Sequence, residues 1–323
     1  MVGKHMGSNL LFLSVGRRVE LIQRFKNARE KLNVKGKIIA VDMKKDAPAL
    51  YFADNFEIIP SVKDINYISE LKRLCSKYNI DLIVPTIDTE LLVLAENRKE
   101  IEDLGVKLLL SNINIIEISN DKIKTNKFFK KHNIDTPEII SKDDLKNSNF
   151  KYPLFIKPRS GSSSFNTFKI KNKKELDFFS YYVHSHIITE YISGDEYSID
   201  VFTDFESNPI TIVPRLRIAT RSGEISKGKI VKDELIINTV KRIIDILKPI
   251  GPITIQCIKN DKCIKFIEIN PRFGGGVPMS MEAGADSAEN IYKLLQGINL
   301  EPYNDYKQGL FSLRYDQAVF LNK

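Results

Sequence analysis

This sequence of 323 residues contains few cysteines and no long apolar run. Its three cysteines, Cys75, Cys257 and Cys263, are odd in number and form no CxxC pair, so we expect a reducing cytoplasm rather than a disulfide framework. No apolar run approaches the roughly 20 residues that a membrane helix needs, and we expect no membrane partner. Residues 1–6 lack the apolar core of a signal peptide and are interpreted as an expression remnant.

Basic residues outnumber acidic ones and give a net charge of +8, yet they are spread along the chain beside many Asp and Glu residues. Neither an arginine-rich tract nor an RNA-binding aromatic motif is present, so we expect no nucleic-acid partner. An anionic small substrate, such as a nucleotide, would account for part of the excess charge. The length leaves room for about two or three domains with buried cores.

Strand and helix patterns alternate over the N-terminal third of the sequence. Apolar strands are expected at residues 10–15, 37–42, 56–60, 81–85 and 106–110. This alternation predicts a parallel sheet in a doubly wound α/β domain, as in a Rossmann-like fold. No Gly-x-Gly-x-x-Gly motif follows the first strand, so a dinucleotide site is not expected.

Ligands of such sheets bind outside the carboxyl ends of the strands, where several charged residues of this sequence are expected. We favour a substrate role for Arg17 and Arg18, which follow the first strand. For Asp88 and Glu90, which follow the fourth strand, a substrate role and simple capping of the next helix are equally open. Asp64 is expected to cap one helix, and Ser119 or Asn120 another that runs from residue 121 to 132.

Residues 266–276 form the most informative motif of the sequence. Apolar and polar residues alternate up to Pro271, which predicts a strand that ends there. Residues two apart in a strand share a face, so Glu268, Asn270 and Arg272 are expected to point together. Two oxygen ligands and a cation on one surface suit Mg²⁺ bound to phosphates. The alternative is a surface strand with solvated polar residues, but the three glycines that follow are typical of a close approach to a ligand.

A second strand is expected at residues 253–258, followed by a polar turn, and the two runs predict a hairpin. If the loop takes residues 261–263, Gln256 falls directly opposite Glu268. Another carbonyl oxygen would then join the same face.

A Gly/Ser-rich loop follows the strand that carries Lys157 and offers N–H and hydroxyl donors that can hold phosphate oxygens. Alone, such a loop is weak evidence, because serine-rich turns are usually only turns. With Lys157 before it and the Glu268 face downstream, a phosphate site is favoured. The loop residues concerned are Ser160, Gly161, Ser162 and Ser163.

Arg215 and Arg217 lie two apart on an expected strand and share a face. Two exposed like charges gain little from each other, so we expect a shared anionic partner, the substrate carboxylate or its acyl-phosphate, with Arg221 a weaker candidate. The alternative is solvated charge, or pairing with Glu206 or Glu224. Residues 159–164 and a loop expected at 221–228 are candidates for a lid.

The residues Gln256, Glu268, Asn270 and Arg272 resemble the Gln…Glu-x-Asn-x-Arg pattern of the ATP-grasp superfamily, in its branch similar to the carbamoyl-phosphate synthase large subunit. The resemblance covers most of the chain and implies a pre-ATP-grasp α/β domain (1–112) before a two-lobed α+β ATP-grasp domain (113–323). The smaller lobe would span 113–190, and the larger lobe, with the metal site, 191–323. ATP and Mg²⁺, or Mn²⁺, are the implied cofactors.

The resemblance also implies roles for individual residues. Glu268 and Asn270 would bind the metal, Gln256 would support that site, and Arg272 would contact the transferred phosphate. Lys157 and Lys122 would hold phosphate oxygens. Backbone groups of Glu190, Tyr191 and Ile192 would read the adenine edge, and Glu196 would hold the ribose hydroxyls.

The function that follows is ATP-dependent ligation of a small carboxylate to an amine through an acyl-phosphate. No convincing Ser/His or Cys/His arrangement is present, and this chemistry needs no side-chain nucleophile. The alternatives are phosphorylation of bicarbonate or carbamate, as in carbamoyl-phosphate synthases, and a non-catalytic ATP-binding subunit. The arginine-containing segment 215–229 departs from the synthetase pattern, and this puts carbamoyl phosphate in doubt as the product. A homodimer is a further expectation.

Overall fold

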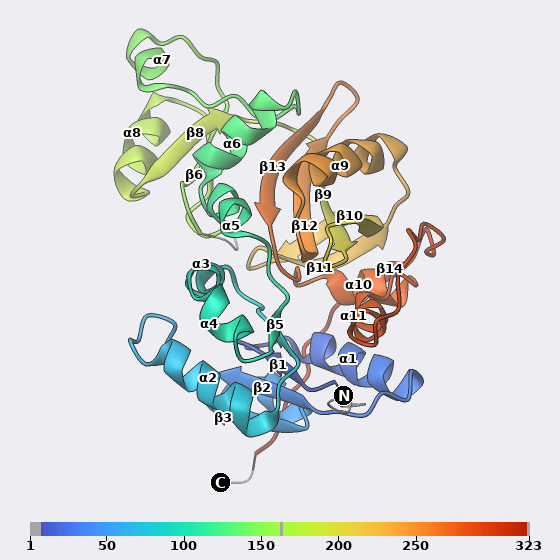
Figure 1. The fold of residues 1–323 in the computed structure, drawn as a ribbon. Coiled ribbons are helices and arrows are strands. Elements are labelled where there is room, and N and C mark those ends of the chain that lie inside the picture. Colours follow the sequence, from blue (N-terminus) through green and yellow to red (C-terminus); the bar gives the residue numbers. More distant parts are fainter. Residues whose placement is uncertain (1–7, 162–163, 322–323) are drawn as a thin grey trace.

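In the computed structural model, which describes residues 8–161 and 164–321, the chain forms three sheets with helices packed around them (Figure 1). Residues 1–6, interpreted above as an expression remnant, and the loop residues Ser162 and Ser163 lie outside the described residues. Within the described ranges, no helix combines the length and the apolar character needed to cross a membrane.

The N-terminal sheet is parallel throughout, with the order β3-β2-β1-β4-β5. Its strands are β1 (Leu10–Phe12), β2 (Ile38–Asp42), β3 (Asn55–Ile58), β4 (Leu82–Val84) and β5 (Lys107–Leu108). Every residue of β1 and β4 is buried, as expected for central parallel strands that are covered by helices on both faces. The predicted doubly wound α/β architecture is confirmed.

Helices cover both faces of this sheet. One face carries α1 (Val19–Lys31) and a 3₁₀ turn (Pro48–Phe52), and the other carries α2 (Tyr67–Tyr78), α3 (Asp88–Glu96) and α4 (Arg98–Glu102). The predicted cap of α2 is wrong, because the Asp64 carboxylate accepts from the N–H of Asn66 (2.8 Å), ahead of the helix.

A second, antiparallel sheet has the order β7-β6-β8 and lies beside four helices. Its strands are β6 (Leu154–Pro158), β7 (Phe168–Ile170) and β8 (His186–Glu190), and the helices are α5 (Ile113–Asn120), α6 (Lys122–Lys131), α7 (Lys142–Asn147) and α8 (Lys173–Tyr182). The expected caps of α6 are wrong. Ser119 and Asn120 belong to α5, and the side chain of Asp121 accepts from the N–H of Ile123 (2.9 Å) instead.

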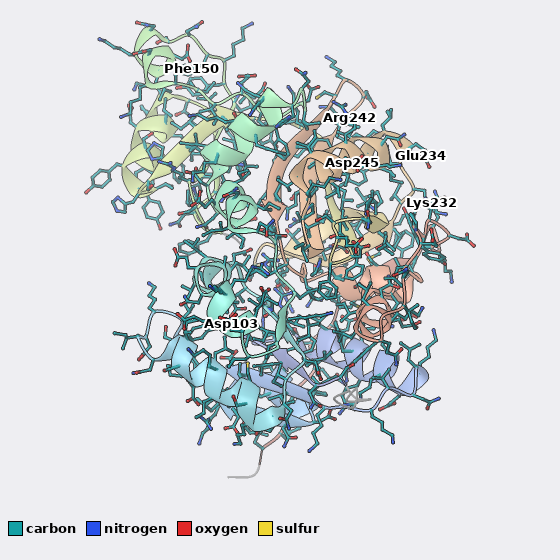
Figure 2. All side chains as sticks on the ribbon, viewed as in Figure 1. Asp103, Phe150, Lys232, Glu234, Arg242 and Asp245 are labelled. Carbon is teal, nitrogen blue, oxygen red and sulfur yellow. The ribbon has the colours of Figure 1, made fainter. Side chains whose placement is uncertain are left out.

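The third sheet is antiparallel, with the order β13-β12-β9-β10-β11-β14. Its strands are β9 (Asp195–Thr203), β10 (Pro209–Arg221), β11 (Glu224–Ile230), β12 (Gly251–Lys259), β13 (Ile264–Asn270) and β14 (Phe311–Leu313). One face packs on α9 (Glu234–Leu247), whose charged residues Arg242 and Asp245 are exposed on its outer side (Figure 2). The opposite face is left for the polar side chains described below.

The expectation of a loop at residues 221–228 is wrong. Arg221 pairs with Glu224 at the end of the β10–β11 hairpin, and the turn between them is Ser222–Gly223. Both turn residues have positive φ, 50° and 75°, which is the geometry of a tight hairpin connection. The segment is therefore a strand pair of the large sheet.

Two C-terminal helices, α10 (Val277–Glu282) and α11 (Ser287–Leu295), return to the N-terminal sheet and pack against α1 (Figure 1). The ring of Phe25 on α1 lies 5.8 Å from that of Phe273 and 6.1 Å from that of Tyr292, measured between centroids. Ion pairs join Arg24 to Glu282 and Lys31 to Glu289. The large sheet is thereby held over the carboxyl ends of the parallel strands.

Candidate functional site

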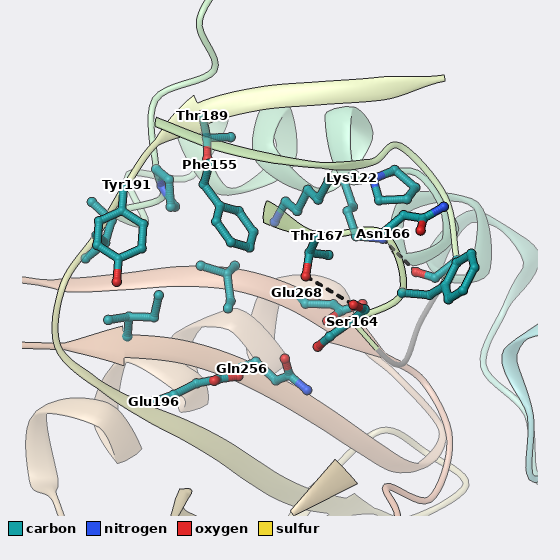
Figure 3. Close-up of a pocket in the computed structure, with 18 of the residues that line it drawn as sticks. Lys122, Phe155, Ser164, Asn166, Thr167, Thr189, Tyr191, Glu196, Gln256 and Glu268 are labelled. Carbon is teal, nitrogen blue, oxygen red and sulfur yellow. Dashed lines mark hydrogen bonds between the residues drawn. The ribbon is translucent and has the colours of Figure 1, made fainter. Parts of the chain in front are cut away.

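A cavity of about 580 Å³, which we call the interlobe cavity, lies between the three-stranded and the six-stranded sheet. Figure 3 shows Phe155, Thr189 and Tyr191 on one side of it and Glu196 and Gln256 on the other. It brings together most of the residues proposed for nucleotide binding: Lys122, Lys157, Ser160, Gly161, Glu190, Tyr191, Ile192, Glu196, Gln256 and Glu268.

Cationic groups mark one end of the interlobe cavity. The pKa of Lys157 is lowered to about 8, chiefly by burial and in part by the charge of Lys122, while the charges of Glu268 and Glu196 act in the opposite direction. The Nζ of Lys122, at the start of α6, donates to the carbonyl of Gly161 (2.6 Å). Two cations therefore face one space beside a loop that is rich in backbone donors, an arrangement suited to phosphate oxygens.

The other end of the interlobe cavity is more apolar. Phe155, Ile258 and Ile267 line it together with Tyr191, over whose ring Lys169 Nζ lies at 3.9 Å. The carboxylate of Glu190 accepts from the N–H of Glu138 (3.0 Å), so this side chain ties two backbone segments together. Apolar and aromatic walls of this kind suit a flat ring system.

A polar layer crosses four strands of the large sheet. Glu268 on β13 lies opposite Gln256 on β12, Gln256 lies opposite Ser198 on β9, and Ser198 lies opposite Arg215 on β10. The predicted pairing of Gln256 with Glu268 is thereby confirmed. The amide of Gln256 fits best with its nitrogen toward Glu268 Oε2 (3.1 Å) and its oxygen toward Arg217 Nη1 (3.3 Å).

A second cavity, of about 250 Å³, adjoins the first and contains so many guanidinium groups that we call it the arginine cavity. Gln256 and Glu268 line both cavities. The other polar residues that line the arginine cavity are Arg18, Asp88, Thr89, Ser198, Arg215, Arg217, Glu224, Thr254, Asn270 and Arg272.

Arg215 is only 2% exposed, so the expectation of an exposed charge on a strand face is wrong. The guanidinium donates to Asp200 through Nε (2.6 Å) and Nη2 (2.7 Å), and neither Glu206 nor Glu224 is its partner. Burial of a charge requires such a partner. The third nitrogen, Nη1, is buried and has no hydrogen-bond partner among the described residues, although Arg215 lines the cavity.

Two further arginines of this cavity are partly satisfied in the same way. Arg217 lies 2.9 Å from Glu196 and donates to the carbonyl of Gly223 (2.8 Å), and Arg272 pairs with Asp88 (2.6 Å). In both, the buried Nε has no partner within the described parts of the chain. Unpaired buried donors are costly, so donors that border one cavity point to an anionic ligand.

The two acidic residues for which alternatives were open differ in role. Glu90 is fully buried and accepts from Ser14 Oγ (2.7 Å) and from the N–H groups of Thr86 (2.8 Å) and Ile87 (3.2 Å), so it stabilises the start of α3. Burial raises its pKa to about 7, although these hydrogen bonds oppose the shift. Asp88 neither caps the helix nor stands free, because its carboxylate pairs with Arg272.

A divalent cation would find its protein ligands in Glu268 and Asn270. Across residues 8–161 and 164–321, no group of three or more His, Cys, Asp or Glu side chains is placed to hold a metal on its own. Mg²⁺ commonly takes only one or two carboxylates and completes its shell with water and phosphates. The donor set therefore fits a metal that arrives with phosphate groups.

Several lining residues were missed by sequence reasoning. Phe155 lies two residues before Lys157 on β6 and so shares its face, a signal that the strand period contained. Ser198 lines the arginine cavity and Asp200 binds Arg215, and both alternate with apolar residues after Glu196, which also marks one polar face. Arg314, near the arginine cavity, comes from a C-terminal segment for which the sequence offered no signal.

Comparison with known proteins agrees with this geometry. A family described as "PylC-like, N-terminal domain" matches residues 10–109, and one described as "ATP-grasp domain" matches residues 119–276. The chain is 27% identical over 173 residues to the carbamoyl-phosphate synthase of Methanobrevibacter smithii, covering 50% of this chain and 45% of that protein.

It is also 33% identical over 144 residues to the formate-dependent phosphoribosylglycinamide formyltransferase of Prochlorococcus marinus, covering 43% of this chain and 35% of that protein. The chain thus spans less than half of the length of either relative.

Among solved structures, the biotin carboxylase domain dimer of the Hydrogenobacter thermophilus 2-oxoglutarate carboxylase, in complex with MgADP, ADP and bicarbonate, has a TM-score of 0.77 at 17% identity. The match covers 95% of this chain and 74% of that one, and it shows a shared fold. Both the predicted family and the predicted fold class are confirmed. The chain belongs to the ATP-grasp superfamily, with an ATP-grasp domain that follows a PylC-like N-terminal domain.

Proposed function

We propose that this protein is an ATP-dependent ligase that activates a small carboxylate as an acyl-phosphate and joins it to an amine. The observation that carries the proposal is that Gln256 and Glu268 line both the interlobe cavity and the arginine cavity. A phosphoryl group at the end of a nucleotide in the first cavity would face an anion held in the second. In-line transfer needs this proximity.

In this proposal, the interlobe cavity binds ATP. Lys122, Lys157, Ser160 and Gly161 hold phosphate oxygens, the backbone of 190–192 reads the adenine edge, and Glu196 holds the ribose. Glu196 also pairs with Arg217, so a ribose hydroxyl would join an existing interaction. Residues 113–323 would form the ATP-grasp domain, with a smaller lobe at 113–190 and a larger lobe at 191–323.

Glu268 and Asn270 would hold Mg²⁺, or Mn²⁺, which supplies positive charge where the phosphoryl group is transferred. Asn270 Oδ1 lies 3.4 Å from Arg272 Nη2, so the proposed metal ligand and the proposed phosphate contact adjoin each other. Arg272 would bring its guanidinium to the same phosphate, and Gln256 would orient Glu268.

The arginine cavity would hold the carboxylate. Arg215 and Arg217 offer N–H groups that lack partners in the described chain, and they would bind the carboxylate and then the acyl-phosphate. A carboxylate oxygen forms a bond to the γ-phosphorus and ADP leaves. The amine nitrogen then bonds to the acyl carbon, the carbon–oxygen bond to phosphate breaks, and orthophosphate and a proton are released.

A second candidate is phosphorylation of bicarbonate or carbamate. It is favoured by the similarity to a carbamoyl-phosphate synthase and by the bicarbonate named in the related biotin carboxylase structure. The formate-dependent relative instead supports a small organic carboxylate. A third candidate is a non-catalytic ATP-binding subunit. The presence of both proposed metal ligands, Glu268 and Asn270, argues against it. The protein would act on small-molecule substrates and would form a homodimer.

Hydroxylamine trapping separates these candidates. The protein would be incubated with MgATP, hydroxylamine and one of a panel of small carboxylates, or bicarbonate, while ADP and hydroxamate are measured. Carboxylate-dependent formation of both supports the ligase. ADP release that depends on bicarbonate, without a hydroxamate, supports the second candidate, and no ADP with any acceptor overturns both.

A further inference from the structure

A third cavity, of about 170 Å³, extends the arginine cavity toward the carboxyl end of β1, and we call it the β1-end cavity. Arg18, Ile87, Glu224, Gly274 and Gly275 line both. At ~30 Å³ per water-sized group, this space holds about six such groups, comparable to the heavy atoms of a small amino acid.

Charged side chains of both signs line the β1-end cavity. Three arginines, Arg17, Arg18 and Arg314, line it together with two glutamates, Glu20 and Glu224. Arg17 has no hydrogen-bond or ion-pair partner among the described residues, whereas Arg18 donates only to the carbonyl of Thr86 (3.0 Å) and Arg314 pairs with Glu224 (3.1 Å). Positive charge is therefore incompletely matched at the end of the cavity that β1 forms.

Glu224 stands at the boundary between the β1-end cavity and the arginine cavity. A Cβ added to Gly275 would lie 2.7 Å from the carboxyl carbon of Glu224, so the glycine loop passes close to this side chain. Burial raises the pKa of Glu224, but the charges of Arg18, Arg314 and Arg17 outweigh that effect, and the pKa lies below its ordinary value. The side chain is thus an anion at neutral pH.

We propose that the β1-end cavity binds the amine substrate and that this amine carries its own carboxylate, as an amino acid does. Glu224 holds the ammonium next to the arginine cavity, and Arg17 and Arg18 hold the carboxylate. This inference rests on the proposed function, because it places the second substrate of the ligase.

Two other ligand classes, dianions and plain amines, fit these charges less well than an amino acid. A dianion would bring negative charge against Glu224, which is unfavourable at such short range. A plain amine would satisfy Glu224 and leave the half-buried Arg18, which donates only to a carbonyl within the described chain, without a carboxylate partner. A zwitterion matches both ends. After its ammonium loses a proton to solvent, the amine nitrogen would face the acyl carbon of the substrate that Arg215 and Arg217 bind in the adjoining cavity.

The test compares two rates on the same carboxylate. Hydroxylamine-dependent hydroxamate formation reports the acyl-phosphate, and amide formation with an added amine reports the second substrate. The amines are the common L-amino acids, their methyl esters, and simple alkylamines. We expect at least one amino acid to form an amide with kcat/KM about tenfold or more above that of its ester and of an alkylamine.

Arg17→Ala and Glu224→Gln should each lower the ratio of amide to hydroxamate formation by about tenfold or more. Arg73→Ala, in an exposed pair on α2, is the matched control and should leave the ratio unchanged. Esters or alkylamines that match the amino acids, an unchanged ratio in both variants, or no amide with any amino acid would each overturn the inference. Absence of hydroxamate with every carboxylate would instead overturn the proposed function itself.

Discussion

The carboxylate of Asp200 accepts two hydrogen bonds from the guanidinium of Arg215, from Nε at 2.6 Å and from Nη2 at 2.7 Å. The same carboxylate accepts from Ser280 Oγ (2.7 Å) on α10. Asp200 thereby fixes which nitrogen of Arg215 remains for a ligand. A Cβ on Gly276 would lie 2.3 Å from that nitrogen, so the glycine loop leaves it room.

We expect Asp200→Asn to reduce the free energy of unfolding by about 3–5 kcal/mol, because removal of one partner leaves a buried charge uncompensated. Urea unfolding at pH 7 measures the difference. The control is Glu70→Gln in the exposed pair with Arg73, which should change stability little. If the two variants unfold alike, the Asp200–Arg215 pair does not stabilise the buried guanidinium.

Glu268→Gln should lower turnover by about 10²–10³-fold, because a single preorganised charge at the transferring phosphate has that value. Raised Mg²⁺ should restore activity only in part. Asp261→Asn, in the turn of the same hairpin, is the control, and steady-state ADP release with the identified carboxylate is the measurement. Normal turnover of Glu268→Gln would remove it from the metal site.

Lys157 should take up a proton when ATP binds near pH 8. Its pKa in the free protein is about 8, so above that pH the amine is largely neutral, and phosphate binding stabilises the ammonium form. ATP affinity should therefore fall as the pH rises through 8. Calorimetry in two buffers with different ionisation enthalpies measures the uptake.

Two variants separate charge from proton exchange at this position. Lys157→Arg should bind ATP without proton uptake, because guanidinium does not titrate near pH 8. Lys157→Ala should lose about 1.5–3 kcal/mol of ATP binding. Uptake that persists in Lys157→Arg would assign the proton to another group.

Glu90 should make stability depend on pH in the opposite sense to an ion-paired carboxylate. Its pKa is raised from 4.5 to about 7 in the folded protein, so folding binds a proton between these values. The contribution of Glu90 is present below about pH 4.5 and is lost as the pH rises to about 7, with a size on the order of 3 kcal/mol. Glu90→Gln, which keeps the acceptor oxygen, should remove this part of the pH dependence. Parallel unfolding curves for both proteins at pH 5 and pH 7.5 would contradict the prediction.

The parallel sheet and the β12–β13 hairpin could be predicted because their signals are local. Alternation of strand and helix indicates parallel pairing, and a short turn fixes the register that sets Gln256 opposite Glu268. Both deductions use only the period of two in strands and the length of a loop.

The environment of Arg215 could not be predicted in the same way. The sequence period places Arg215 on a face, but its partner Asp200 comes from the neighbouring strand β9, whose register depends on the connection at residues 204–208. Likewise, Ser222–Gly223 is a composition typical of loops, and only the pairing of Arg221 with Glu224 makes it a hairpin turn.

The packing of α11 on α1 has a consequence for synthesis on the ribosome. The parallel sheet is encoded by residue 108, whereas α11 begins at residue 287, so the side of α1 that meets Tyr292 emerges long before its cover. At ~5–20 residues per second, this interval lasts about ten to forty seconds. During it, the nascent chain presents the apolar ring of Phe25 at an incomplete surface, where chaperones that bind exposed apolar segments can reach it.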